Sequence, residues 1–270
     1  MTGNDRRVAI ITGGSQGIGA SLVAGYLGRG WAVVANARTI GPSADPCVLT
    51  VEGDITKPAT ADRIVEGALE RFGRIDTLVN NAGVFVSKPF TDYTAADYAL
   101  LTGVNLGGFF WLTQRVIAEM VSRYGGHVVN VLASLAEVAS SGAPSILAAL
   151  SMGGLAAATR SLAVEYASRG IRVNAVSPGI IQTPVHPGES CEGLGGQLPP
   201  IGRAGQVSDV VGGILFLESA PYITGEVLHI DGGQIAGHKD REASSRSQSR
   251  PGFPWRCRWP GCSGDLLRPV

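Results

Sequence analysis

The sequence predicts an α/β domain with a doubly wound parallel sheet, and two observations predict it. Short runs of apolar, β-branched residues, typical of buried strands, recur along most of the chain. Longer segments with helical spacing separate them. Because this alternation favours right-handed strand–helix–strand crossovers, the strands should be parallel and helices should cover both faces of the sheet.

The expected strands are short and apolar, and they lie at Val8–Ile11, Ala32–Val34, Val48–Val51, Thr77–Val79, Val128–Val131, Arg172–Val176 and Val227–Ile230. The expected helices between them include Ala61–Phe72, Leu106–Arg123 and Ile146–Ser168. No feature of this region marks a boundary for a second folded domain. We therefore expect a single domain over residues 1–236.

The remaining residues, 237–270, differ in composition from the domain. They are rich in Arg, Ser, Pro and Gly and show no apolar periodicity, so we expect a disordered C-terminal tail. Cys257 and Cys262 stand there beside two tryptophans, but two cysteines without neighbouring histidines fall short of a four-ligand zinc site. No metal is predicted.

Composition and charge limit the partners and the location of the protein. The formal net charge of the 270 residues is zero, which favours neither a nucleic acid nor an anionic membrane as partner. The four cysteines show no disulfide spacing, and the N-terminus lacks the basic and then apolar pattern of a signal peptide. We expect a soluble, cytoplasmic protein.

A glycine-rich turn, Thr12-Gly-Gly-Ser-Gln-Gly-Ile-Gly19, follows the first expected strand and begins the first helix. Glycines there allow a tight turn and let the backbone approach a pyrophosphate at the positive end of a helix. The turn therefore predicts a dinucleotide site that includes Gly13, Ser15, Gln16, Gly17, Ile18 and Gly19. A glycine turn that binds nothing is the open alternative.

Two further segments, Asn80-Asn-Ala-Gly83 and Ser177-Pro-Gly-Ile-Ile-Gln-Thr-Pro184, accompany this turn. Together the three motifs resemble those of the short-chain dehydrogenase/reductase family, and the resemblance covers residues 6–235. It implies a Rossmann-type fold and a nicotinamide dinucleotide cofactor. The further contacts that it implies are Asp54 and Ile55 at the adenine, Asn81, Ala82 and Gly83 along the cofactor trough, and Pro178, Gly179 and Thr183 at the nicotinamide.

The end of the second expected strand bears on which dinucleotide binds. An acidic residue at Ala37 would accept hydrogen bonds from the adenosine ribose and disfavour a 2′-phosphate, but none is present and Arg38 follows. This pattern predicts NADP(H) rather than NAD(H). The alternative is that Arg38 is a solvated loop residue.

The resemblance fails where the family carries its acid–base residues. A Tyr-x-x-x-Lys pair there precedes a small-small-Leu step like Gly153-Gly154-Leu155, and alignment on that step places Ala148 and Met152 at the Tyr and Lys positions. A phenol can protonate a carbonyl oxygen as hydride arrives, whereas alanine has no titratable proton. Losing one positioned acid costs ~10²–10⁴ in rate. The missing Lys should also weaken the hold on the ribose, so NADP(H) could bind weakly.

Two other catalytic positions are retained only in part. By resemblance, Asn105 would organise a proton-relay water. Ser134 is the nearest candidate for the serine that steadies a substrate carbonyl, but it fits only with a shift of one residue, because Ala133 occupies the family position. His186, Glu189 and Cys191, in the expected substrate loop, are further candidates for a replacement acid.

Three functions are compatible with this pattern. The first is a non-catalytic subunit of a hetero-oligomeric NADP(H)-dependent oxidoreductase, paired with a catalytically intact relative that acts on a small-molecule or carrier-bound hydroxy or keto group. This arrangement is similar to the paired reductase-like proteins of aminocoumarin antibiotic pathways. The second is an active, atypical ketoreductase in which the substrate supplies its own proton. The third is a regulatory NADP(H)-binding protein. We favour the first.

Overall fold

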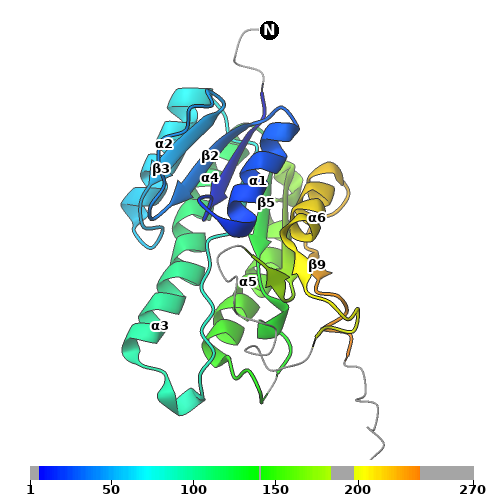
Figure 1. The fold of residues 1–270 in the computed structure, drawn as a ribbon. Helices are drawn as coiled ribbons and strands as arrows, with labels where there is room; N and C mark the ends of the chain where they lie inside the picture. The colour runs from blue at the N-terminus through cyan, green and yellow to red at the C-terminus, as the bar shows by residue number, and fades with distance from the viewer. Residues whose placement is uncertain (1–5, 140, 184–197, 238–270) are drawn as a thin grey trace, which may run out of the picture. The chain divides into compact units, whose positions relative to one another are not determined.

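The computed structural model confirms the predicted fold class (Figure 1). It describes residues 6–139, 141–183 and 198–237. The predicted tail beyond residue 237 and the candidate acids His186, Glu189 and Cys191 lie outside these ranges. The sheet has seven parallel strands in the order β3-β2-β1-β4-β5-β6-β9. They span Val8–Thr12 (β1), Ala32–Ala37 (β2), Val48–Glu52 (β3), Thr77–Asn80 (β4), Gly126–Val131 (β5), Ile171–Pro178 (β6) and Val227–Ile230 (β9).

Helices cover both faces of this sheet, as parallel strands require. Along β1, Ala9 and Ile11 pack toward α1 (Gly17–Gly28) and α6 (Val207–Ser219), and Figure 1 shows these two helices together on one face. Val8 and Ile10 pack on the other face. The main helices of that face are α2 (Pro58–Phe72), α4 (Phe109–Ser122) and α5 (Ile146–Tyr166).

Several boundaries differ from the predicted ones for physical reasons. Helix α2 begins at Pro58 rather than Ala61, because a proline is accepted in the first turn, where no backbone N–H needs an intrahelical partner. The helix expected from Leu106 is longer: α3 (Ala95–Leu101) continues through a π-helical turn, η2 (Thr102–Gly108), into α4. Apolar periodicity cannot reveal a π-turn, which inserts one residue into the helical repeat.

Short elements connect the main ones. Three 3₁₀ turns, η1 (Phe90–Asp92), η3 (Ser134–Ala136) and η4 (Ala167–Arg169), lie between helices and strands. A small separate sheet pairs β7 (Ile181–Gln182) with β8 (Gly205–Gln206), immediately after β6 and before α6. These elements have too few residues to be predicted from a pattern.

The amino-terminal ends of β4, β5 and β6 meet around the carboxylate of Glu218 in α6, whose side chain is 7% exposed. Its Oε2 accepts hydrogen bonds from Thr77 Oγ1 at 2.9 Å and from His127 Nδ1 at 3.1 Å. Asn174 Nδ2 and Arg172 Nη1 donate to the other imidazole nitrogen of His127, at 3.1 and 3.3 Å. Burial lowers the pKa of His127, and these two donors require the neutral tautomer with its proton on Nδ1.

One helical run, Ile146–Arg169, is long and apolar enough to span a membrane by length and composition alone. Eight residues of α5 are buried within the protein, and Ala163 belongs to the same core cluster as strand residues Val128 and Val173. The buried residues of this helix therefore belong to the core of the protein.

Candidate cofactor site and active site

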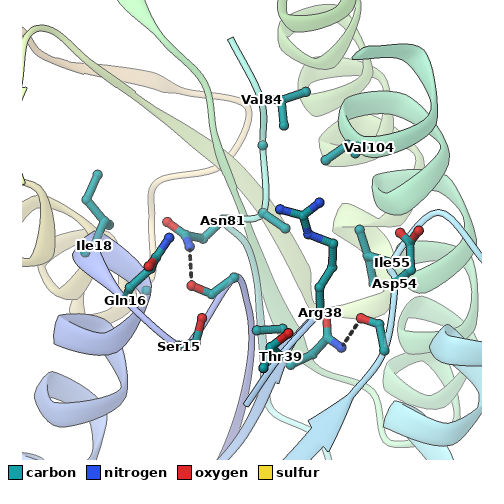
Figure 2. A pocket seen from close by; sticks show the side chains of 18 of the residues that line it. Ser15, Gln16, Ile18, Arg38, Thr39, Asp54, Ile55, Asn81, Val84 and Val104 are labelled. Carbon is teal, nitrogen blue, oxygen red and sulfur yellow. Dashed lines mark hydrogen bonds between the residues drawn. The ribbon is translucent and has the colours of Figure 1, made fainter. Parts of the chain in front are cut away.

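A cleft of about 730 Å³ lies at the carboxyl ends of β1 to β4 (Figure 2). Ligands bind at this edge in open α/β sheets. Thirteen of the fifteen predicted cofactor residues line it: Gly13, Ser15, Gln16, Gly17, Ile18, Gly19, Arg38, Asp54, Ile55, Asn81, Ala82, Gly83 and Thr183. Lining residues that the sequence analysis missed include Thr39, Val84, Leu100 and Val104, which carry no motif of their own.

The β1–α1 turn has the geometry of an anion-binding turn. Gly13 and Gly17 have φ values of 67° and 55°, which favour glycine. A Cβ atom on Gly19 would lie 2.0 Å from the Gly13 carbonyl oxygen, so only glycine fits there. No side chain caps the start of α1 at Gln16. The first N–H groups of α1 and its positive dipole end are thus available to a phosphate.

Thr12 and Asn81 fix the end of β4 against the end of β1. Thr12 Oγ1 accepts hydrogen bonds from the backbone N–H groups of Asn81 and Ala82 at 3.0 and 2.9 Å. The Asn81 side chain returns a hydrogen bond from Nδ2 to the Thr12 carbonyl at 2.8 Å. Asn81 therefore holds the floor of the cleft in place.

Arg38 and Asp54 are the charged side chains that line the cleft. Figure 2 shows Ser15, Gln16 and Ile18 on one side of the cleft, and Arg38, Asp54 and Ile55 on the other. Arg38 is exposed, and none of the ion pairs among the described residues uses it. Asp54 Oδ1 accepts a hydrogen bond from the Thr56 N–H at 2.9 Å. The guanidinium is therefore free to meet a phosphate, whereas one oxygen of Asp54 is already used in a turn.

Ala148 and Met152 are both buried residues of α5. Ala148 is 0% exposed and belongs to an apolar cluster with Leu101 and Leu147. Met152 is 6% exposed, and its methyl carbon lies 4.0 Å from where a Cβ atom on Gly83 would stand. Neither position offers a titratable group or a hydrogen-bond donor to the cleft.

Asn105 lies in the π-helical turn, and its side-chain amide is fully engaged. Its Oδ1 accepts from the Val84 N–H at 2.9 Å, and its Nδ2 donates to the Val84 carbonyl and to Ser151 Oγ, both at 3.0 Å. An internal cavity of about 10 Å³ beside Asn105 and Met152 has room for about one water molecule. Ser151 was not predicted as a site residue, although its position between Ala148 and Met152 on one helix could have indicated it.

Ser134 does not line the cleft. It is fully buried, and its Oγ donates to Gln234 Oε1 at 3.1 Å. The same loop is held by Glu137, which accepts a hydrogen bond from Ser177 Oγ and contacts His229 Nε2 at 3.2 Å. These contacts attach the loop after β5 to β6, β9 and the segment beyond.

Pro178 and Gly179 are the two predicted cofactor residues that do not line the cleft. Pro178 is the last residue of β6 and is buried. Gly179 donates its N–H to the Ile230 carbonyl at 3.0 Å, and a Cβ atom on it would lie 2.8 Å from Asp231 Cα. The structure places both against β9 and Asp231 rather than with the other thirteen residues.

The sheet order, the glycine turn and the cleft together define a Rossmann-type dinucleotide-binding protein. The profile of the enoyl-(acyl carrier protein) reductase family matches residues 14–234. The chain belongs to the short-chain dehydrogenase/reductase family.

Three relatives illustrate the likeness. A ketoacyl reductase of the granaticin polyketide synthase from Streptomyces violaceoruber is 37% identical over 240 residues, 84% of this chain and 95% of that protein. A subunit of a hydroxy(phenyl)methylsuccinyl-CoA dehydrogenase from Thauera aromatica is 35% identical over 246 residues, 86% of this chain and 98% of that protein. The solved structure of ElxO with NADP bound is 28% identical, with a TM-score of 0.79, and covers 86% of this chain and 100% of that one.

Proposed function

We propose that this chain is an NADP(H)-binding, non-catalytic subunit that assembles with a catalytically intact relative. One observation carries the proposal: the two positions that align with the acid–base pair of the family are Ala148, buried in an apolar cluster, and Met152, which is also buried. Neither can donate a proton to a carbonyl oxygen. The chain retains the fold and the cleft of a reductase without its proton chemistry.

No neighbouring phenol among the described residues replaces the missing acid. Tyr93 packs against the cluster that contains Ala148, but its hydroxyl donates to the Val86 carbonyl at 2.7 Å. The segment that carries Tyr93 and Val86 is itself held to the residues just before α5, because Ser87 Oγ and the Lys88 N–H each donate to the Pro144 carbonyl at 3.0 Å. The phenol proton of Tyr93 is thus used inside this segment.

NADP(H) is the cofactor that the cleft favours. Arg38 extends from the end of β2 into the cleft without a carboxylate partner, where it can pair with a 2′-phosphate. Met152 supplies no ammonium for the ribose hydroxyls, so we propose that binding is weaker than in a relative that retains the Lys. ElxO, a structural neighbour, was solved with NADP bound, which supports the choice.

The exposed side of α5 supports a protein partner. Its residues Ile146, Leu150 and Val164 are 40%, 62% and 82% exposed, and Gly153 and Ala157 between them are exposed as well. Small and apolar residues on one side of a helix allow close approach of another helix. The relative from Thauera aromatica is named as a subunit, which supports a multi-subunit arrangement.

We propose that the partner subunit binds and converts the substrate. We propose a hydroxy or keto group on a small molecule or an acyl carrier, reached in the cytoplasm during the synthesis of a secondary metabolite. The granaticin relative, named as a ketoacyl reductase, supports this class of substrate.

The test is co-expression with a family member that retains Tyr-x-x-x-Lys, followed by native mass spectrometry. The proposal predicts a hetero-oligomer that Leu150→Arg and Val164→Arg each disrupt, because both place a charge on the exposed side of α5. Phe90→Ser, which changes a 74% exposed residue of η1, is the matched control and should leave assembly intact. A stable homo-oligomer that ignores the relative contradicts the proposal.

The intact cleft also supports the second candidate, a reductase in which the substrate supplies the proton. That function requires hydride transfer by the isolated chain, which the proposed subunit lacks. The two are therefore separated by turnover rather than by cofactor binding.

A further inference from the structure

We infer that the cleft recognises only the 2′-phosphoadenosine and pyrophosphate part of the dinucleotide, so that NADPH, NADP⁺ and 2′-phospho-ADP-ribose bind with similar affinity. This inference rests on the proposed function and deepens it. It would make the chain a subunit that senses the presence of the dinucleotide but not its redox state.

The first observation concerns which elements supply the lining. The cleft is formed by the β1–α1 turn, the ends of β2 and β3, the segment after β4, and Leu100 and Val104. Among the described residues, none of the loop after β5 or of α5 lines it, and Thr183 is the only lining residue that follows β6. Among these elements, the β1–α1 turn and the end of β2 are the ones that meet the pyrophosphate and the adenosine ribose in a Rossmann-type fold.

Polar groups expected at the substrate carbonyl, at the relay water and at the nicotinamide are occupied by partners within the protein. Ser134 is hydrogen bonded to Gln234, and the Asn105 amide is hydrogen bonded to Val84 and Ser151. The Gly179 N–H is hydrogen bonded to Ile230. Each of these N–H and O–H donors therefore already has an acceptor within the protein. Exchanging that acceptor for a ligand atom would bring no net gain in free energy.

The third observation concerns Thr183, the remaining candidate for a nicotinamide contact. A Cβ atom on Gly17 would lie 3.8 Å from Thr183 Cγ2. Thr183 therefore lies beside the phosphate turn, where its hydroxyl can serve the pyrophosphate. Of the charged and dipolar groups in the cleft, Arg38 and the start of α1 both select phosphate, whereas Asp54 has one oxygen engaged by the Thr56 N–H.

The test is calorimetry on the full chain with NADPH, NADP⁺ and 2′-phospho-ADP-ribose, which lacks only the nicotinamide. We expect the three dissociation constants to agree within about threefold, less than the tenfold that one good hydrogen bond can contribute. Arg38→Ala should weaken all three by about tenfold to a hundredfold, the range for a charge-assisted hydrogen bond. Lys57→Ala, an exposed cation outside the cleft, is the matched control for general charge.

Two further arms keep the outcomes distinct. Thr183→Val should change the three affinities by one common factor, and a loss confined to NADPH and NADP⁺ would overturn the inference. Adenosine 3′,5′-bisphosphate should bind more weakly than adenosine 2′,5′-bisphosphate, and the reverse order would assign the site to a 3′-phosphoadenosine ligand instead.

NADPH binding more than about thirtyfold tighter than 2′-phospho-ADP-ribose, about 2 kcal/mol, also overturns the inference and leaves the proposed function standing. Failure of all ligands to bind contradicts the NADP(H) site itself.

Discussion

The side-chain amide of Asn105 donates a hydrogen bond to the hydroxyl of Ser151, with 3.0 Å between Nδ2 and Oγ. Ser151 stands between Ala148 and Met152 on α5, and both partners of the hydrogen bond are buried, at 3% and 1% exposure. This contact joins the π-helical turn to the helix that carries the acid–base residues in the family. It holds the two elements together.

Ser151→Ala tests the structural value of that contact. The change leaves one N–H of Asn105 buried without an acceptor, which costs about 1–3 kcal/mol. We expect the free energy of unfolding in urea to fall by that amount. Ser161→Ala, at an exposed position of the same helix, should change it by less than about 0.5 kcal/mol. Equal effects of the two changes would show that the hydrogen bond is not what stabilises this helix pair.

Restoring the acid–base pair should not restore catalysis. Ala148 is completely buried among Leu101 and Leu147, so Ala148→Tyr overpacks the cluster at a cost of about 1–3 kcal/mol. The double change Ala148→Tyr with Met152→Lys should lower stability and leave ketone reduction at the background rate. Met152→Leu, a change of similar volume, should cost less than about 1.5 kcal/mol. A stable double variant that reduces ketones would show that the cleft is open to substrate.

The cofactor preference should follow the charge at the end of β2. Ala37→Asp places a carboxylate on the lining of the cleft, where it repels a 2′-phosphate and accepts hydrogen bonds from a ribose 2′-hydroxyl. We expect NADPH to bind at least about tenfold more weakly and NADH to bind more tightly, as measured by calorimetry. An unchanged ratio of the two affinities would place the 2′-phosphate away from β2.

Two glycines of α1 should respond in opposite ways to the same substitution. Gly19→Ala sets a methyl group against the Gly13 carbonyl and should abolish NADPH binding or unfold the protein. Gly28→Ala adds a methyl group where no atom lies within 4 Å. It should stabilise the protein by up to about 1 kcal/mol, because alanine loses less entropy in a helix. Thermal denaturation and calorimetry of both variants check this contrast.

Stability should fall on mild acidification because of His127. Burial lowers its pKa below the ordinary value of 6.5, so the folded protein keeps it neutral while the unfolded chain takes up a proton. The contribution of neutral His127 to the free energy of unfolding is therefore present above pH 6.5 and declines as the pH falls below that value. His127→Gln should remove that decline between pH 6.5 and 4.5. This interval lies above the pH range in which protonation of Glu218 lowers the stability. A decline of the same slope in the variant would assign it to other groups.

Much of the fold could be predicted from the sequence, because strands and turns are indicated by patterns of neighbouring residues. The strand Val8–Ile11 and the turn to Gly19 are read from apolar runs and glycine spacing, and the structure places them as β1 and the β1–α1 turn. Ser134 could not be placed in this way. Its hydrogen-bond partner Gln234 is 100 residues away, and only the folded sheet brings the two together. The same holds for Asn105 and Ser151, which are 46 residues apart.

A single-turnover experiment with the isolated full chain tests the proposed function most directly. The protein, saturated with NADPH, is mixed with a 3-ketoacyl thioester, and NADPH absorbance is followed beside a protein-free control. We predict no decay above that control, because the buried Ala148 and Met152 provide no proton for the carbonyl oxygen. A decay that rises with protein concentration and is lost in Arg38→Ala would contradict the proposed function and show that the isolated chain is itself a reductase.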